Sequence, residues 1–302
     1  MGFLLKSCKI WIVASRPHTL SAALVPVLVG SALAAAEGGF GWGLFVLTAA
    51  GAVLVQIGTN FTDEYADHGA TRSVHKYLAP HKVIARGLLS HRAVRLGAAT
   101  VFGLATLIGL WLVWRTGWPL LAVCLFSVAV AYAYSAGPYP LGDYGLGEVL
   151  VFVVMGPVMV GATYYVQTHS YGWEALWAAL PVGALVAAIL VANNLRDEEE
   201  DRKTGRYTLA TMFGPRPVRG GYLALLVTAY SVPVVLVLLG RAGPWLTLPW
   251  LTLPLAFVVG RWILRGRDRD TLHRALKGTS ALHLLFGLAL ALGLLAGGIS
   301  GS

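Results

Sequence analysis

The sequence predicts an all-α, polytopic membrane protein, and three observations support that prediction. Of the 302 residues, 57% are hydrophobic and only 12% are charged, about half the charged share of an ordinary soluble domain. The hydrophobic residues gather in runs of about 20, the length at which a helix crosses a bilayer. These runs lack the alternation of a membrane β-barrel, so helices are the expected spanning form. The composition excludes a soluble two-domain protein, a disordered chain and a collagen-like chain.

Nine segments qualify as spans, and we expect them to form one bundle. The first contains Arg16 and the fourth is short, but both remain apolar enough to be counted. In chain order they cover roughly residues 11–35, 41–62, 92–114, 117–135, 146–167, 173–195, 219–240, 244–264 and 276–298. The two long loops, about 63–91 and 196–218, are expected to be functional, because long loops in compact proteins usually are. The whole chain, 1–302, is therefore predicted to be a single transmembrane domain.

The distribution of charge predicts the orientation. In a soluble chain a net charge of +9 would suggest a nucleic-acid partner. With the N-terminus in the cytoplasm, every lysine and arginine except Arg115 and Arg241 falls on or near the cytoplasmic side, as the positive-inside rule requires. Every aspartate and glutamate except Glu37 and Glu174 lies on that side too. This bias supports the number of spans and places the C-terminus outside.

Two acidic clusters close the second and sixth spans. The first is Asn60-Phe61-Thr62-Asp63-Glu64-Tyr65-Ala66-Asp67, and the second is Asn193-Asn194-Leu195-Arg196-Asp197-Glu198-Glu199-Glu200-Asp201. If the helices continue through these segments, the Asn and Asp side chains of each cluster share one helix face.

Such clusters suit a bound cation. Oxygen ligands of this kind fit Mg²⁺, which takes one or two carboxylates and completes its shell with water and phosphate. With lysines and arginines nearby, two facing clusters would form a site for Mg²⁺ and a diphosphate. The alternative is that they are two solvated helix ends paired with bases, but asparagine in an apolar span is costly unless its amide is used. The two cysteines, Cys8 and Cys124, lie far apart without metal-ligand spacing and are interpreted as unpaired.

Three stretches carry a family resemblance. The second cluster continues from Asp201 through Arg202-x-x-Gly205-Arg206-x-Thr208-Leu209-Ala210. The others are Tyr134-Ser135-Ala136-Gly137-Pro138-Tyr139-Pro140-Leu141-Gly142 with the later Gly156-Pro157, and Arg16-Pro17-His18-Thr19-Leu20. Together, over about residues 10–215, they resemble the UbiA-type intramembrane prenyltransferases, and most of all the 1,4-dihydroxy-2-naphthoate polyprenyltransferases of menaquinone biosynthesis.

The resemblance implies a reaction. A polyprenyl diphosphate would bind both clusters through Mg²⁺, with two ions expected, and an aromatic ring would attack the allylic carbon as diphosphate leaves. With 1,4-dihydroxy-2-naphthoate as acceptor, the ring carboxylate leaves as CO₂ and demethylmenaquinone results. The resemblance also implies a central cavity open to the cytoplasmic side and a place in a bacterial-type inner membrane. The partners are the two substrates and the lipid bilayer, with no nucleic acid and no protein partner evident.

The resemblance also assigns residues. The expected metal ligands are Asp63, Glu64, Asp67, Asp197 and Asp201, and Lys82 and Tyr134 are the further catalytic candidates. The candidates for substrate binding are Asn60, Asn193, Asn194, Arg196, Arg16, Lys203, Arg206, Arg72 and His81.

Several of these assignments leave alternatives open. The family's usual Asn-x-x-Asn-Asp-x-x-Asp is here Asn60-x-x-Asp63-Glu64-x-x-Asp67, so either Asp63 or Glu64 is the ligand. Lys82 stands where the family carries arginine, and a lysine offers a point charge without a bidentate fork. Tyr134 would equally suit an interfacial aromatic, and Arg16 a snorkelling side chain.

Rival functions remain within and outside this class. The acceptor could instead be a benzoate, a homogentisate-like ring or a lipid. A cation-coupled transporter would also carry acids and asparagines in its spans, but its sites tend to lie at the bilayer midplane. Both clusters here close a span at one membrane face.

Overall fold

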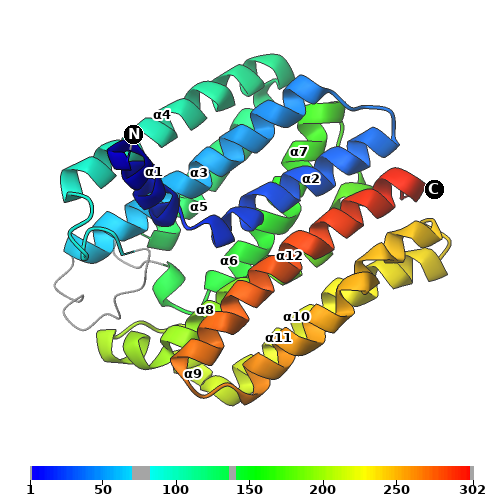
Figure 1. Cartoon of the computed structure of the whole chain (residues 1–302). Helices are drawn as coiled ribbons and strands as arrows, with labels where there is room; N and C mark the ends of the chain where they lie inside the picture. The colour runs from blue at the N-terminus through cyan, green and yellow to red at the C-terminus, as the bar shows by residue number, and fades with distance from the viewer. Residues whose placement is uncertain (1, 70–81, 136–140, 300–302) are drawn as a thin grey trace.

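The computed structural model describes residues 2–69, 82–135 and 141–299, and of residues 2–7, 66–69, 132, 135 and 143 it describes the backbone only (Figure 1). Within these ranges the helices are α1 (Gly2–Ala14), α2 (Leu20–Ala36), α3 (Trp42–Gly69), α4 (His91–Thr116), α5 (Trp118–Ser135), α6 (Gly147–Val153), α7 (Met159–Thr168), α8 (Trp173–Thr204), α9 (Leu209–Phe213), α10 (Pro215–Leu238), α11 (Leu253–Arg265) and α12 (Arg269–Gly297). Short 3₁₀ turns η1 (Pro17–Thr19), η3 (Leu141–Asp143) and η5 (Pro244–Thr252), and the π-helical turn η4 (Val154–Val158), join or extend them.

Eight helical segments in the described residues are long and apolar enough to cross a membrane. They correspond to all of the predicted spans except the fourth, which is α5. The apolar part of α5 that meets the same criterion of composition, Trp118–Ala131, is shorter. The prediction of an all-helical, multi-span bundle is confirmed, while the count of nine crossings and the orientation stay predictions.

The predicted span at residues 11–35 is not one helix. α1 ends at Ala14, Arg16 adopts a left-handed conformation with φ of 49°, and the chain turns through η1 before α2 begins. Pro17 has no backbone N–H, so it cannot continue α1, but its fixed φ suits the start of a new helical turn. The spanning segment therefore runs from Pro17 to Ala36.

α2 lies at the centre of the bundle. It packs against α3 and α7 on one side and against α8 and α12 on the other. Figure 1 shows that α3 and α8 end, and α12 begins, toward the same end of the molecule. The break before α2 is therefore placed between the two acidic helix ends.

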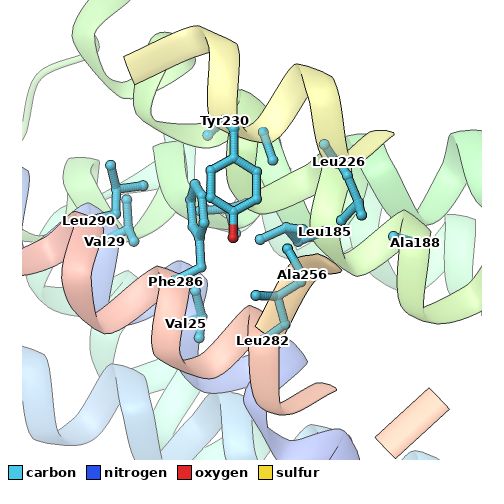
Figure 2. Close-up of a cluster of buried hydrophobic side chains, with 14 of the residues drawn as sticks. Val25, Val29, Leu185, Ala188, Leu226, Tyr230, Ala256, Leu282, Phe286 and Leu290 are labelled. Atoms are coloured by element: carbon cyan, nitrogen blue, oxygen red, sulfur yellow. The ribbon is translucent and has the colours of Figure 1, made fainter. Parts of the chain in front are cut away.

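The largest buried cluster joins α2, α8, α10, α11 and α12. In Figure 2, Tyr230 and Phe286 meet edge to face at its centre, with ring centroids 5.2 Å apart. Val25 from α2 and Leu185 from α8 pack around them, and all of these side chains are buried. In lipid, such close packing replaces the hydrophobic drive between helices, so this cluster holds the helices that carry the second acidic segment.

A second, smaller cluster fixes the loop that precedes α4. Val83 and Ile84 are buried against Phe61 of α3 and Val94 of α4. Ser90 accepts a hydrogen bond from the Ala93 N–H and so caps α4. This packing holds Lys82 beside the end of α3.

Candidate functional site

The first acidic cluster lies on the last three turns of α3, and its side chains take different partners. Asn60 is buried, and its amide donates to the Ser15 carbonyl at 2.8 Å and to the Thr19 hydroxyl at 2.9 Å. It therefore ties α3 to the break between α1 and α2. One turn later the side chain of Asp63 is 49% exposed and lies 3.4 Å from the Arg16 guanidinium.

Glu64 points the other way, into the loop before α4. Its side chain is only 2% exposed, and Oε1 accepts a hydrogen bond of 3.0 Å from the Ile84 N–H. Its Oε2 lies 3.8 Å from Lys82 Nζ, and the Lys82 side chain is itself largely buried. Glu64 thus anchors the loop, while Asp63 faces the space beside Arg16.

The second cluster lies on the last turns of α8 and is engaged by arginines. Arg196 donates to both carboxylate oxygens of Asp197, at 2.9 and 2.5 Å, and to Asn193 Oδ1 at 2.8 Å. Asp201 is buried, and its Oδ1 lies 3.2 Å from Arg206. The predicted continuation of the helix through the motif is confirmed, because α8 ends only at Thr204.

A basic stripe on α12 faces this cluster. Arg269 donates to Asp197 Oδ1 and Glu200 Oε2, both at 3.0 Å. One turn on, His273 Nδ1 lies 3.5 Å from Arg196, and Lys277 follows after another turn. Sequence reasoning assigned the bases of this region to orientation alone. Their spacing of i, i+4 and i+8 repeats that of Asn193, Asp197 and Asp201, and a helical stripe is the signal that could have revealed them.

His18 lies between the two clusters. It stands in η1 within electrostatic range of Arg16, which contacts Asp63, and of Arg196, which contacts Asp197. It is also within range of Lys277 and His273 on α12, which packs against η1. The structure therefore brings both acidic segments and the α12 stripe to one region around the start of α2.

Tyr134 and Asn194 belong to a neighbouring corner, at the start of α6. The Asn194 amide donates to Glu148 Oε1 at 2.9 Å, and both side chains are buried. Tyr134 packs on the first residue of α6, where a Cβ on Gly147 would lie 3.5 Å from its hydroxyl. Farther along the same helices, η4 packs closely on α8, since a Cβ on Gly156 would come within 2.8 Å of Gly183.

Some predicted site residues lie elsewhere. Lys203 pairs with Glu199 at 2.7 Å on the outer face of α8, where both side chains are largely exposed. Arg72 and His81 lie outside the described residues, as does the side chain of Asp67. The structure thus gathers Asp63, Asp197, Arg16 and Arg196 into one region and turns Lys203 away from it.

The donor set fits Mg²⁺ by its chemistry. Asp63 and Asp197 are partly exposed carboxylates that face cationic side chains. No group of three or more metal-binding side chains stands preassembled among the residues that the structure describes. The two carboxylates themselves are of the kind that suits Mg²⁺, which binds through one or two carboxylates together with substrate phosphates.

Comparisons with known proteins match one family over most of the chain. The family described as "UbiA prenyltransferase family" matches residues 23–288. The chain is 34% identical to the 1,4-dihydroxy-2-naphthoate octaprenyltransferase of Mycobacterium tuberculosis, over 93% of this chain and 95% of that protein. It is 31% identical to the octaprenyltransferase of the same description from Bacillus subtilis, over 93% and 90% of the two chains.

Solved structures share the fold. A UbiA homolog from Aeropyrum pernix superposes with a TM-score of 0.67 at 19% identity, covering 91% of this chain and 97% of that one. A UbiA homolog from Archaeoglobus fulgidus, solved with DMAPP and Mg²⁺, superposes with a TM-score of 0.62 at 15% identity, covering 93% and 98%. At these identities the likeness is one of fold.

Proposed function

Because the chain belongs to the UbiA prenyltransferase family, and is therefore a multi-pass membrane polyprenyltransferase, we propose that its substrates are a polyprenyl diphosphate and 1,4-dihydroxy-2-naphthoate. The observation that supports this proposal is that the first acidic segment is bound to the break before α2, while the second is bound to α12, which packs against η1. We further propose that the whole chain acts as one domain in a bacterial-type inner membrane, with this region facing the cytoplasm.

The proposed reaction balances without an oxidant. The bond between the allylic carbon and the diphosphate oxygen breaks, and diphosphate leaves with the electron pair. The ring carbon that carries the carboxylate forms the new C–C bond, and the carboxylate leaves as CO₂. The first product is the quinol form of demethylmenaquinone.

Asp63 and Asp197 would hold Mg²⁺, with Asp67 and Asp201 as further candidate ligands. The bound ions would supply positive charge to the diphosphate as negative charge develops on it. Glu64, in contrast, would position Lys82 through the loop before α4, since its carboxylate bonds the Ile84 N–H and lies beside Lys82.

The cations around η1 would bind the anionic groups of the substrates. Arg196 and Arg269 are held by the acidic cluster of α8. Lys277 is exposed and has no ion pair within the described part of the chain, so it is available to a substrate carboxylate. Together with His18 it would orient the acceptor. Tyr134, packed at the start of α6, would form an aromatic wall that excludes water from the allylic carbon.

The test is an assay in vesicles with octaprenyl diphosphate, Mg²⁺ and a panel of acceptors that includes 1,4-dihydroxy-2-naphthoate, a benzoate and homogentisate. We expect prenylation of the naphthoate with release of CO₂, abolished by EDTA and by Asp197→Asn. Glu199→Gln is the matched control, because Glu199 lies two residues away on the same helix with its side chain 83% exposed.

The outcomes separate the parts of the proposal. Prenylation of a different ring alone would remove the naphthoate assignment and leave the transferase. Activity of Asp197→Asn equal to that of Glu199→Gln would remove the metal-site assignment.

A further inference from the structure

A second basic site lies at the start of α10 and the end of α11, and none of its lining residues belongs to the acidic clusters. Two adjoining cavities, of about 410 and 420 Å³, open there and share Arg265. Arg261 lines the first cavity, and Arg216, Arg219 and Arg267 line the second. Five guanidinium groups thus line two cavities that share Arg265.

Most of this positive charge is not neutralised by the protein. Arg216, Arg261, Arg265 and Arg267 are exposed, and none has an ion pair within the residues that the structure describes. Arg219 differs, because its guanidinium donates to the carbonyls of Leu264 and Gly266, at 3.1 and 2.6 Å, and so ties α10 to the end of α11.

The remaining charges near the cavities do not balance this excess. Arg219 and Arg267 lie close enough to repel each other. Asp268 is the single carboxylate lining the first cavity, and it is committed to capping α12 through the Thr271 N–H at 2.8 Å. Hydrogen bonds from Thr271 hold the pKa of the Asp268 carboxyl below its usual range, so it stays ionised.

The walls change from apolar to basic along α11. Phe257, Arg261 and Arg265 follow one another at i, i+4 and i+8 on an exposed face, which spans about 12 Å of helix. Arg261 lies over the Phe257 ring, 5.9 Å from its centroid. Trp262 lines the first cavity beside them, and tryptophan favours the depth of lipid headgroups.

The change from apolar to basic side chains along α11 complements the acyl chains and phosphate of a phospholipid. Acyl chains would lie along Phe257 and Val258, and a phosphate would reach Arg261 and Arg265 at the end of the helix. Guanidinium groups bind phosphate through paired hydrogen bonds, and basic pockets between membrane helices bind anionic headgroups. We propose that this surface is a binding site for an anionic phospholipid, lined by residues other than those of the two acidic clusters and independent of the proposed reaction.

The positive-inside rule alone does not account for the site. The rule requires basic residues near the ends of spans. It does not require them to line two cavities that share Arg265 and lie beside Phe257 and Trp262. Arg92 and Arg95, at the start of α4, are exposed basic residues without ion pairs in the described chain. They provide a matched control at the same end of the bundle.

The test uses native mass spectrometry of the full chain in detergent, with palmitoyl-oleoyl phosphatidylglycerol and phosphatidylcholine as probes. We expect phosphatidylglycerol to bind the unaltered chain, and the Arg261→Gln/Arg265→Gln variant to bind it roughly tenfold more weakly. Arg92→Gln/Arg95→Gln is expected to stay within about twofold of the unaltered chain, since it removes equal charge from another place.

A second measurement does not depend on the folding of any variant. Phosphatidylglycerol should raise the melting temperature of the unaltered chain more than phosphatidylcholine does, and millimolar inorganic phosphate should not abolish the difference. Equal losses in both arginine variants, equal binding of the two lipids, or displacement by inorganic phosphate would each overturn the proposal.

Discussion

Asp63 and Glu64, neighbouring residues at the end of α3, have different partners and therefore different expected roles. A helix turns successive side chains by about 100°, so Asp63 and Glu64 meet different surroundings. Asp63 is half exposed beside Arg16, whereas Glu64 is buried against the loop before α4. Because substrate and cation approach from the open side, the geometry favours Asp63 as a metal ligand and Glu64 as a positioning residue.

Conservative substitutions can distinguish the roles of Asp63 and Glu64. We expect Asp63→Asn to lower kcat about 100-fold and to raise the Mg²⁺ concentration needed for half-maximal rate, since it removes a charge that faces the site. Glu64→Gln is expected to keep the Mg²⁺ requirement but to lower the melting temperature. Mg²⁺ titrations and thermal unfolding of both variants measure the difference, and a larger shift in Mg²⁺ requirement for Glu64→Gln would reverse the assignment.

Asn60 is buried with its amide bound to Ser15 and Thr19. We expect Asn60→Ala to destabilise the protein by about 1–3 kcal/mol, because it leaves the half-buried Ser15 carbonyl and Thr19 hydroxyl without this donor. Thermal unfolding in detergent measures the effect, with Thr59→Ala as the control on the exposed side of the same turn. Equal melting temperatures for the two variants would show that the amide does not hold the break in place.

At the scale of elements, α12 supplies basic side chains to the acidic end of α8. Its first three turns present Arg269, His273 and Lys277 toward α8 and η1. Arg269 neutralises carboxylates of α8, which would otherwise repel one another on a shared face. The stripe therefore both stabilises the end of α8 and leaves Lys277 for a ligand.

Two substitutions on α12 test this division. We expect Lys277→Gln to raise the KM for the acceptor about tenfold with a smaller change in the KM for the diphosphate, because one charge to the acceptor carboxylate is lost. Arg274→Gln removes an equal charge from an exposed neighbour that donates to Thr271, and it is expected to leave both KM values unchanged. Steady-state kinetics with each substrate varied in turn provide the measurement, and equal effects of the two substitutions would rule out a specific role for Lys277.

At the scale of the whole molecule, the prediction concerns its orientation in the membrane. The charge distribution predicts that the end carrying both acidic clusters does. Only Cys8 and Cys124 need replacement before single cysteines are introduced. In sealed, right-side-out vesicles, we expect Arg115→Cys to react with an impermeant maleimide from outside and Lys203→Cys to react only after permeabilisation. The reverse pattern would invert the topology.

Much of this architecture was predictable because its signals are local. A run of about 20 apolar residues specifies a membrane helix wherever it occurs, and the asparagine and aspartate motifs of α3 and α8 are readable at fixed spacing. The break at Arg16 and Pro17 was missed because hydropathy averaged over a window passes over a single turn. The roles of Asp63 and Glu64 could not be separated, since both are carboxylates and only their neighbours differ.

By itself, then, the sequence determined the helical class, the positions of the spans, and the two acidic motifs, because hydrophobic length and residue spacing act within one segment. Only the tertiary structure decided that α2 separates the motifs, that Arg269 and His273 meet the second motif, and that arginines of α10 and α11 surround two shared cavities. These features depend on packing between segments distant in the chain, and on which face of each helix is turned inward.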